Sequence, residues 1–119
     1  MSRSRLIILA ALVLLLAAAV SGASRDPRPG EPYALLFGTV YNPENRPVAG
    51  VKIQIRRAEK KKPEWRLVSD RRGEFAQRVP AGKAEYVIVA DIKTKGPKPE
   101  VKVQVENDER LDISLHLTE

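Results

Sequence analysis

The stretch Asp70-Arg71-Arg72-Gly73-Glu74-Phe75 carries residue types that could form a calcium loop, a catalytic acid on a turn, or a bend between strands. A calcium loop places acidic or amide side chains at alternating positions, and two of the positions here are arginine. Asp70 can accept hydrogen bonds from the backbone N–H groups that follow it, and Gly73 can adopt the positive φ that a short β-hairpin loop needs. The pattern therefore predicts a structural hairpin turn, after which Phe75 points inward.

His116 is the only histidine in the chain, and there is no cysteine. A general base acts on a nucleophile or substrate held at a fixed position, and a zinc site takes several histidine, cysteine or acidic ligands. No serine, cysteine or acidic partner of His116 is indicated by the spacing, and we expect this residue on the polar face of the last strand. We therefore predict no catalytic residue, no metal and no cofactor.

Six basic residues gather in and around one segment that lies between two expected strands. Such a group is either a solvated loop or a weak electrostatic contact with an anionic polymer or with lipid headgroups. Nucleic acid is not expected, because no known binding motif is present and the net charge of +6 falls to +4 without Arg3 and Arg5. The candidate contact residues are Arg56, Arg57, Lys60, Lys61, Lys62 and Arg66.

The first 23 residues have the three-part composition of a secretory signal peptide. A short basic start precedes an apolar run over residues 6–20, and the small residues Ser21-Gly22-Ala23 follow. The apolar run is shorter than the roughly 20 residues that a membrane-spanning helix requires. We expect cleavage after Ala23 and a secreted or periplasmic protein, with retention of residues 6–20 as a membrane anchor as the alternative. The domain must then be stabilised without disulfides.

The rest of the chain consists of a proline-rich leader at 24–34 and a domain at 35–119. Within this domain, short segments alternate between apolar and polar residues, and turn residues separate them, which predicts strands with one buried face. The segment 86–90 is apolar throughout, which is typical of a central strand covered on both faces. Seven such strands predict an all-β, Greek-key β-sandwich, at 35–41, 50–56, 64–69, 74–79, 85–91, 100–105 and 110–117.

The order of several motifs resembles the carboxypeptidase regulatory-like domain, a β-sandwich that is also called transthyretin-like or prealbumin-like. The motifs are Gly38-Thr39-Val40, the turn from Pro47 to Gly50, the segment from Asp70 to Phe75, and Gly82 leading to Tyr86. The resemblance covers residues 35–117, although the segment before Tyr86 is longer than usual and no glycine–aromatic pair follows that strand. The same fold hosts a hydrolase of purine catabolism, but its several histidines and its Tyr-Arg-Gly-Ser ending have no counterpart here.

These patterns together predict a non-enzymatic, exported module with a binding, adhesion or scaffold role in the cell envelope. The expected partner is a protein or a polysaccharide of the envelope, and neither its identity nor the oligomeric state follows from the sequence. Two alternatives stay open at this point. One is an accessory protein that keeps its N-terminal anchor, and the other is a transthyretin-like hydrolase, which the single histidine disfavours.

Overall fold

Residues 26–118 are described by the computed structural model, and they form seven β-strands in two sheets. The predicted all-β fold is confirmed, and no helix long and apolar enough to cross a membrane occurs among these residues. The expected signal peptide lies outside the described range. The strands are β1 (Tyr33–Tyr41), β2 (Lys52–Arg57), β3 (Trp65–Val68), β4 (Glu74–Pro80), β5 (Ala84–Ala90), β6 (Glu100–Val105) and β7 (Arg110–His116).

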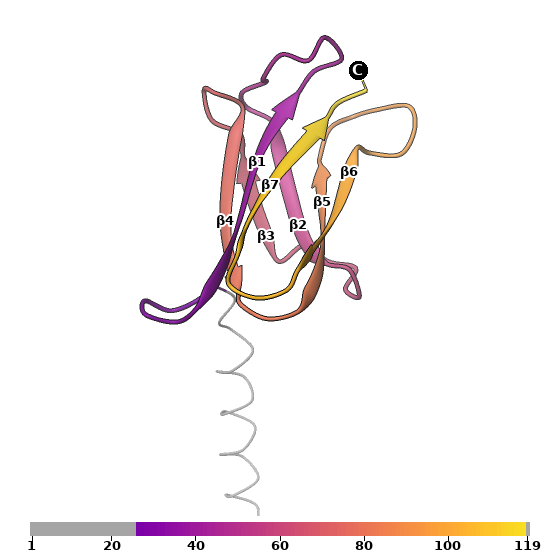
Figure 1. Cartoon of the computed structure of the whole chain (residues 1–119). Coiled ribbons are helices and arrows are strands. Elements are labelled where there is room, and N and C mark those ends of the chain that lie inside the picture. Colours follow the sequence, from indigo (N-terminus) through magenta and orange to yellow (C-terminus); the bar gives the residue numbers. More distant parts are fainter. Residues whose placement is uncertain (1–25, 119) are drawn as a thin grey trace, which may run out of the picture.

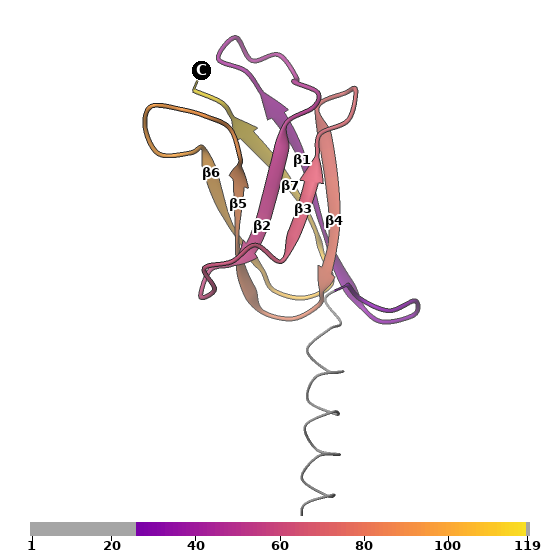
Figure 2. The same cartoon turned by 180° about the vertical axis from the view of Figure 1, so that it is seen from behind.

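The two sheets pack face to face, and the chain changes sheet four times (Figure 1, Figure 2). One sheet has the order β4-β1-β7, in which β1 is antiparallel to β4 and parallel to β7. The other has the order β3-β2-β5-β6 and is antiparallel throughout. Because its connections pass from one sheet to the other, the chain forms the predicted β-sandwich. The observed strand ends differ from the expected ones by at most two residues, and β1 begins at Tyr33, inside the segment expected to be leader.

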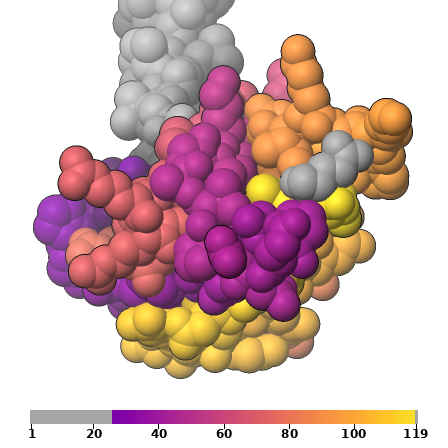
Figure 3. Space-filling model, turned by 90° about the horizontal axis from the view of Figure 1, so that it is seen from above, coloured from indigo at the N-terminus to yellow at the C-terminus, as the bar shows by residue number. Residues whose placement is uncertain are grey.

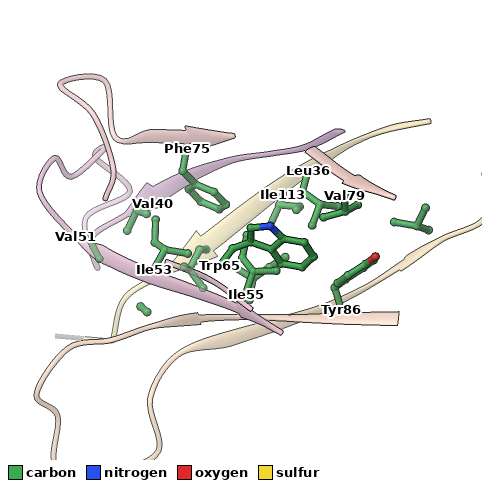
Figure 4. Packing of buried hydrophobic residues seen from close by; sticks show 14 of the residues in the cluster. Leu36, Val40, Val51, Ile53, Ile55, Trp65, Phe75, Val79, Tyr86 and Ile113 are labelled. Carbon is green, nitrogen blue, oxygen red and sulfur yellow. The ribbon is translucent and has the colours of Figure 1, made fainter. Parts of the chain in front are cut away.

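Inward-facing side chains of both sheets form one hydrophobic core (Figure 4). Alternation along β1 places Ala34, Leu36 and Val40 in this core, while Leu35, Phe37 and Thr39 are less buried. Trp65 of β3 and Tyr86 of β5 lie close together at one end of it, with ring centroids 6.0 Å apart. The remaining members include Ile53, Ile55, Phe75, Val79, Ile88, Val105, Ile113 and Leu115.

Strand β5 is central in its sheet, as predicted, but only one of its faces is covered by the second sheet. Val87 points to the other face and is nevertheless only 1% exposed. Its cross-strand partners are Arg56 on β2 and Lys102 on β6. The aliphatic stems of such long side chains can cover an apolar neighbour while their charged ends stay in water. The expected second covering layer is therefore not present over this described strand, whose outer face has arginine and lysine as the neighbours of Val87.

Candidate anion-contact surface and its surroundings

The segment from Asp70 to Phe75 is a tight structural turn. The Oδ1 atom of Asp70 accepts hydrogen bonds from the backbone N–H groups of Arg72 at 2.8 Å and Glu74 at 2.9 Å. Gly73 has a φ of 75°, and Phe75 is buried in the core. The turn does not close a hairpin, however, because β3 and β4 belong to different sheets. The prediction of a hairpin was wrong, since local turn chemistry does not reveal which sheet the next strand joins.

Of the six basic residues predicted as a contact, Arg56 has an internal role. Its Nη1 atom donates to the backbone carbonyl of Lys60 at 2.9 Å, and it also lies within 3.4 Å of the carbonyls of Arg57 and Ala58. The guanidinium group therefore holds the β2–β3 loop together from inside. These contacts all use the Nη1 end of the guanidinium group, so part of the charge of Arg56 is directed at the backbone of its own loop.

Arg57 and Lys60 both lie near one carboxylate in the same loop. The Oε1 atom of Glu64 is 3.8 Å from Arg57 Nε and 3.8 Å from Lys60 Nζ. Lys61 and Lys62 are exposed at the loop. The local positive charge is thus partly neutralised by Glu64, whereas Lys61 and Lys62 present their charge to solvent at the loop.

Arg66 lies on strand β3, outside the loop. It is exposed on β3, where its cross-strand partner is Gln54, and it lines a depression together with Lys52 and Asp91. Of the six predicted residues, Arg66 is the one that lines this depression.

His116 and Tyr86, the side chains with reactive groups, both contact other side chains of the domain. His116 is exposed, and its ring stacks on that of Tyr41 with centroids 5.2 Å apart. The hydroxyl group of Tyr86 is buried near Arg57 and Glu64, and burial raises the pKa of this phenol, an effect that Arg57 partly offsets. Within residues 26–118, no three histidine, cysteine or acidic side chains are grouped so as to hold a metal ion.

A second group of cations, which the sequence did not indicate, surrounds Asp91 just after β5. Lys98 Nζ donates to Asp91 Oδ1 at 2.6 Å, and Gln54 Nε2 donates to Asp91 Oδ2 at 3.3 Å. The hydrogen bond and the charge of Lys98 lower the pKa of Asp91, so the carboxylate is ionised at neutral pH. Lys52, Lys93 and Lys98 line a depression beside it.

Three of the lysines near Asp91 fall within six residues of the β5–β6 loop, which is the signal that could have found them: Lys93, Lys95 and Lys98. Lys52 and Arg66 come from β2 and β3, and their closeness to this loop depends on the strand order β3-β2-β5-β6. No local pattern could have shown that juxtaposition.

Comparison with known proteins agrees with this architecture. The model of the carboxypeptidase regulatory-like domain family matches residues 36–116, which is most of the described range. A search of the curated proteins finds no match.

Several solved structures share the fold at low sequence identity. A DUF3823 family protein from Parabacteroides merdae is 20% identical, with a TM-score of 0.55 over 74% of this chain and 47% of its own. The 5-hydroxyisourate hydrolase of Klebsiella pneumoniae is 14% identical, with a TM-score of 0.54 over 72% of this chain and 92% of its own. The shaft pilin SpaA of Lactobacillus rhamnosus GG is 12% identical, with a TM-score of 0.52 over 73% and 47%. The chain thus spans about half the length of the first and third of these proteins.

Proposed function

Because this chain belongs to the carboxypeptidase regulatory-like domain family, we propose that it is a non-enzymatic β-sandwich module with a binding or scaffold role in the cell envelope. The observation that carries the proposal is that several polar side chains form hydrogen bonds with the backbone of the loops around them. Arg56 holds three loop carbonyls, and Asp70 holds two N–H groups of a turn. Ser69 accepts from Val51 N and donates to Val48 O. These side chains shape loops rather than meet in a reactive cleft.

The shaft pilin SpaA has the same fold, and this structural use of the fold supports a scaffold role. The similar hydrolase does not favour an enzyme, because the single histidine of this chain is exposed and stacked on Tyr41. We further propose that the module is secreted or periplasmic after removal of residues 1–23. The basic, apolar and small-residue succession at the start of the sequence supports export.

Cell fractionation combined with intact-mass measurement of the native protein tests this proposal. We expect the protein in the secreted or periplasmic fraction, with the mass of a chain that begins at Ser24. A full-length mass in the membrane fraction would instead support the anchored alternative, in which residues 6–20 are retained. A full-length protein in the cytosol would overturn the proposed export and the envelope role with it.

A further inference from the structure

Cations from three parts of the chain surround a concave region at one end of the sandwich. We define the β5–β6 cationic surface as Lys52, Arg66, Lys93, Lys95 and Lys98. Lys52, Lys93 and Lys98 line one depression with Asp91 and Thr94, and Lys52 and Arg66 line an adjoining one, which also contains Asp91. The β5–β6 loop stands at the end of the sandwich opposite the β2–β3 loop, and its atoms project at the rim in the view from above (Figure 1, Figure 3).

The charge of this surface is strongly unbalanced. Asp91 is the one acidic residue that lines either depression, and its pKa is lowered by Lys98, so it stays ionised. All five basic side chains are exposed. Lys98 is engaged with Asp91 at 2.6 Å. Lys52, Arg66 and Lys93 line the two depressions with exposed side chains, and Lys95 is exposed in the same loop beside them in the sequence. Clefts lined by one sign of charge raise the local concentration of ligands of the opposite sign.

We infer that the β5–β6 cationic surface binds a linear anionic polysaccharide, a ligand class that rests on the proposed envelope role. Lysine is depleted at protein–protein interfaces, where aromatic residues and arginine provide most of the anchors, whereas this surface holds four lysines and no aromatic residue. Single-stranded nucleic acid is bound by stacking bases on aromatic rings, which this surface also lacks. A concave region suits a single polymer chain better than a flat bilayer.

Retention on immobilised polygalacturonic acid across a salt series tests the inference with two charge-matched triple variants of the native protein. The first variant, Lys52→Gln with Lys93→Gln and Lys95→Gln, removes three cations from the surface and leaves the Lys98–Asp91 pair intact. The second, Lys60→Gln with Lys61→Gln and Lys62→Gln, makes the same change in net charge at the opposite end. We expect binding at least about tenfold weaker for the first variant and within about twofold of wild type for the second. Equal weakening of both would show dependence on net charge alone and overturn the site.

Asp91→Asn provides a change in the opposite direction, which loss of folding cannot imitate. This substitution removes the one carboxylate of the two depressions, and we expect retention to increase by about two- to tenfold at low salt. Unchanged or weaker retention of a folded Asp91→Asn variant would contradict the inference. Urea titration of each variant verifies the fold.

Three further probes separate the alternative partners: neutral dextran, vesicles that contain phosphatidylglycerol, and duplex DNA. We expect no retention on dextran and weaker binding to vesicles and DNA than to polygalacturonic acid. Preference for vesicles or DNA would overturn the assignment to polysaccharide. An exported protein that ignores polygalacturonic acid overturns this inference alone, whereas a full-length cytosolic protein overturns the proposed function.

Discussion

At the scale of single residues, the turn after β3 depends on the carboxylate of Asp70 and on the absence of a side chain at Gly73. Asp70 accepts from two backbone N–H groups, and the Gly73 N–H donates to the carbonyl of Asp70 at 2.9 Å. Gly73 is also packed against the loop after β1. A Cβ atom at this position would lie 2.8 Å from Val48 N and 2.9 Å from Pro47 Cβ. Glycine is therefore needed both for its φ of 75° and for the close approach of two loops.

Gly73→Val should accordingly destabilise the domain by about 3 kcal/mol or more, because backbone strain and overpacking act together. Asp70→Ala should cost less, about 1–2 kcal/mol, since it removes an acceptor that is largely exposed to water. The free energy of unfolding from urea titration measures both. Equal stability of wild type and Gly73→Val would show that the turn relaxes freely, contrary to the packing seen here.

At the scale of elements, the leader before β1 is attached to the edges of both sheets. Asp26 Oδ1 accepts from Trp65 Nε1 at 2.7 Å and from Gln77 Nε2 at 3.2 Å. Trp65 belongs to β3 and Gln77 to β4, which are edge strands of different sheets. One carboxylate thus bridges the two sheets at their open side. The proline-rich leader is in this respect a part of the domain, although the sequence indicated only a linker.

Asp26→Ala should release this contact and change the fluorescence emission of Trp65, the single tryptophan of the chain. Release of the leader opens the indole N–H of Trp65 to water, so we expect emission at longer wavelength. Loss of the hydrogen bond to a charged acceptor should also lower the free energy of unfolding by about 1–2 kcal/mol.

Glu31→Ala is the matched control, because Glu31 lies in the same leader and its carboxylate accepts from Arg28 N, at 3.4 Å, within the leader itself. This variant should keep the emission and the stability of wild type. An unchanged spectrum for Asp26→Ala would mean that the leader is not attached to Trp65 in solution.

At the scale of the whole molecule, a single core must stabilise the domain, since there is no cysteine to form a disulfide. The buried residues come from both sheets, and Leu36, Ile53, Ile55, Ile88 and Leu115 are fully inaccessible. A domain of this size has only a modest margin of stability, about 5–15 kcal/mol in general. The loss of one large core side chain is therefore a substantial fraction of the total.

Leu36→Ala should reduce the free energy of unfolding by about 2–5 kcal/mol, because it leaves a cavity between the sheets. Val68→Ala offers a comparison at a residue that is 60% exposed, and this change should stay within about 0.5 kcal/mol of wild type. Thermal or urea denaturation distinguishes the two. Similar losses for both variants would contradict the assignment of Leu36 to the core.

Local patterns were sufficient to predict the seven strands, the sandwich class and the turn at Asp70 and Gly73. Alternation with a period of two and the φ preference of glycine depend on neighbours along the chain, so they can be read without knowing the fold. The parallel pairing of β1 with β7, the crossing between sheets after β3, and the flanking of Val87 by Arg56 and Lys102 depend on strand order.

The same distinction applies to the candidate site. The six basic residues near the β2–β3 loop are close in sequence, but contacts with carbonyl groups and with Glu64 engage three of them. The β5–β6 cationic surface instead joins Lys52 and Arg66 to a loop whose lysines are 27 (Arg66 to Lys93) to 46 (Lys52 to Lys98) residues away in the sequence. Charges spread over the chain become one surface only when long-range pairing places β2 beside β5 and β3 on the other side of β2. That pairing is set by the packing of the shared core.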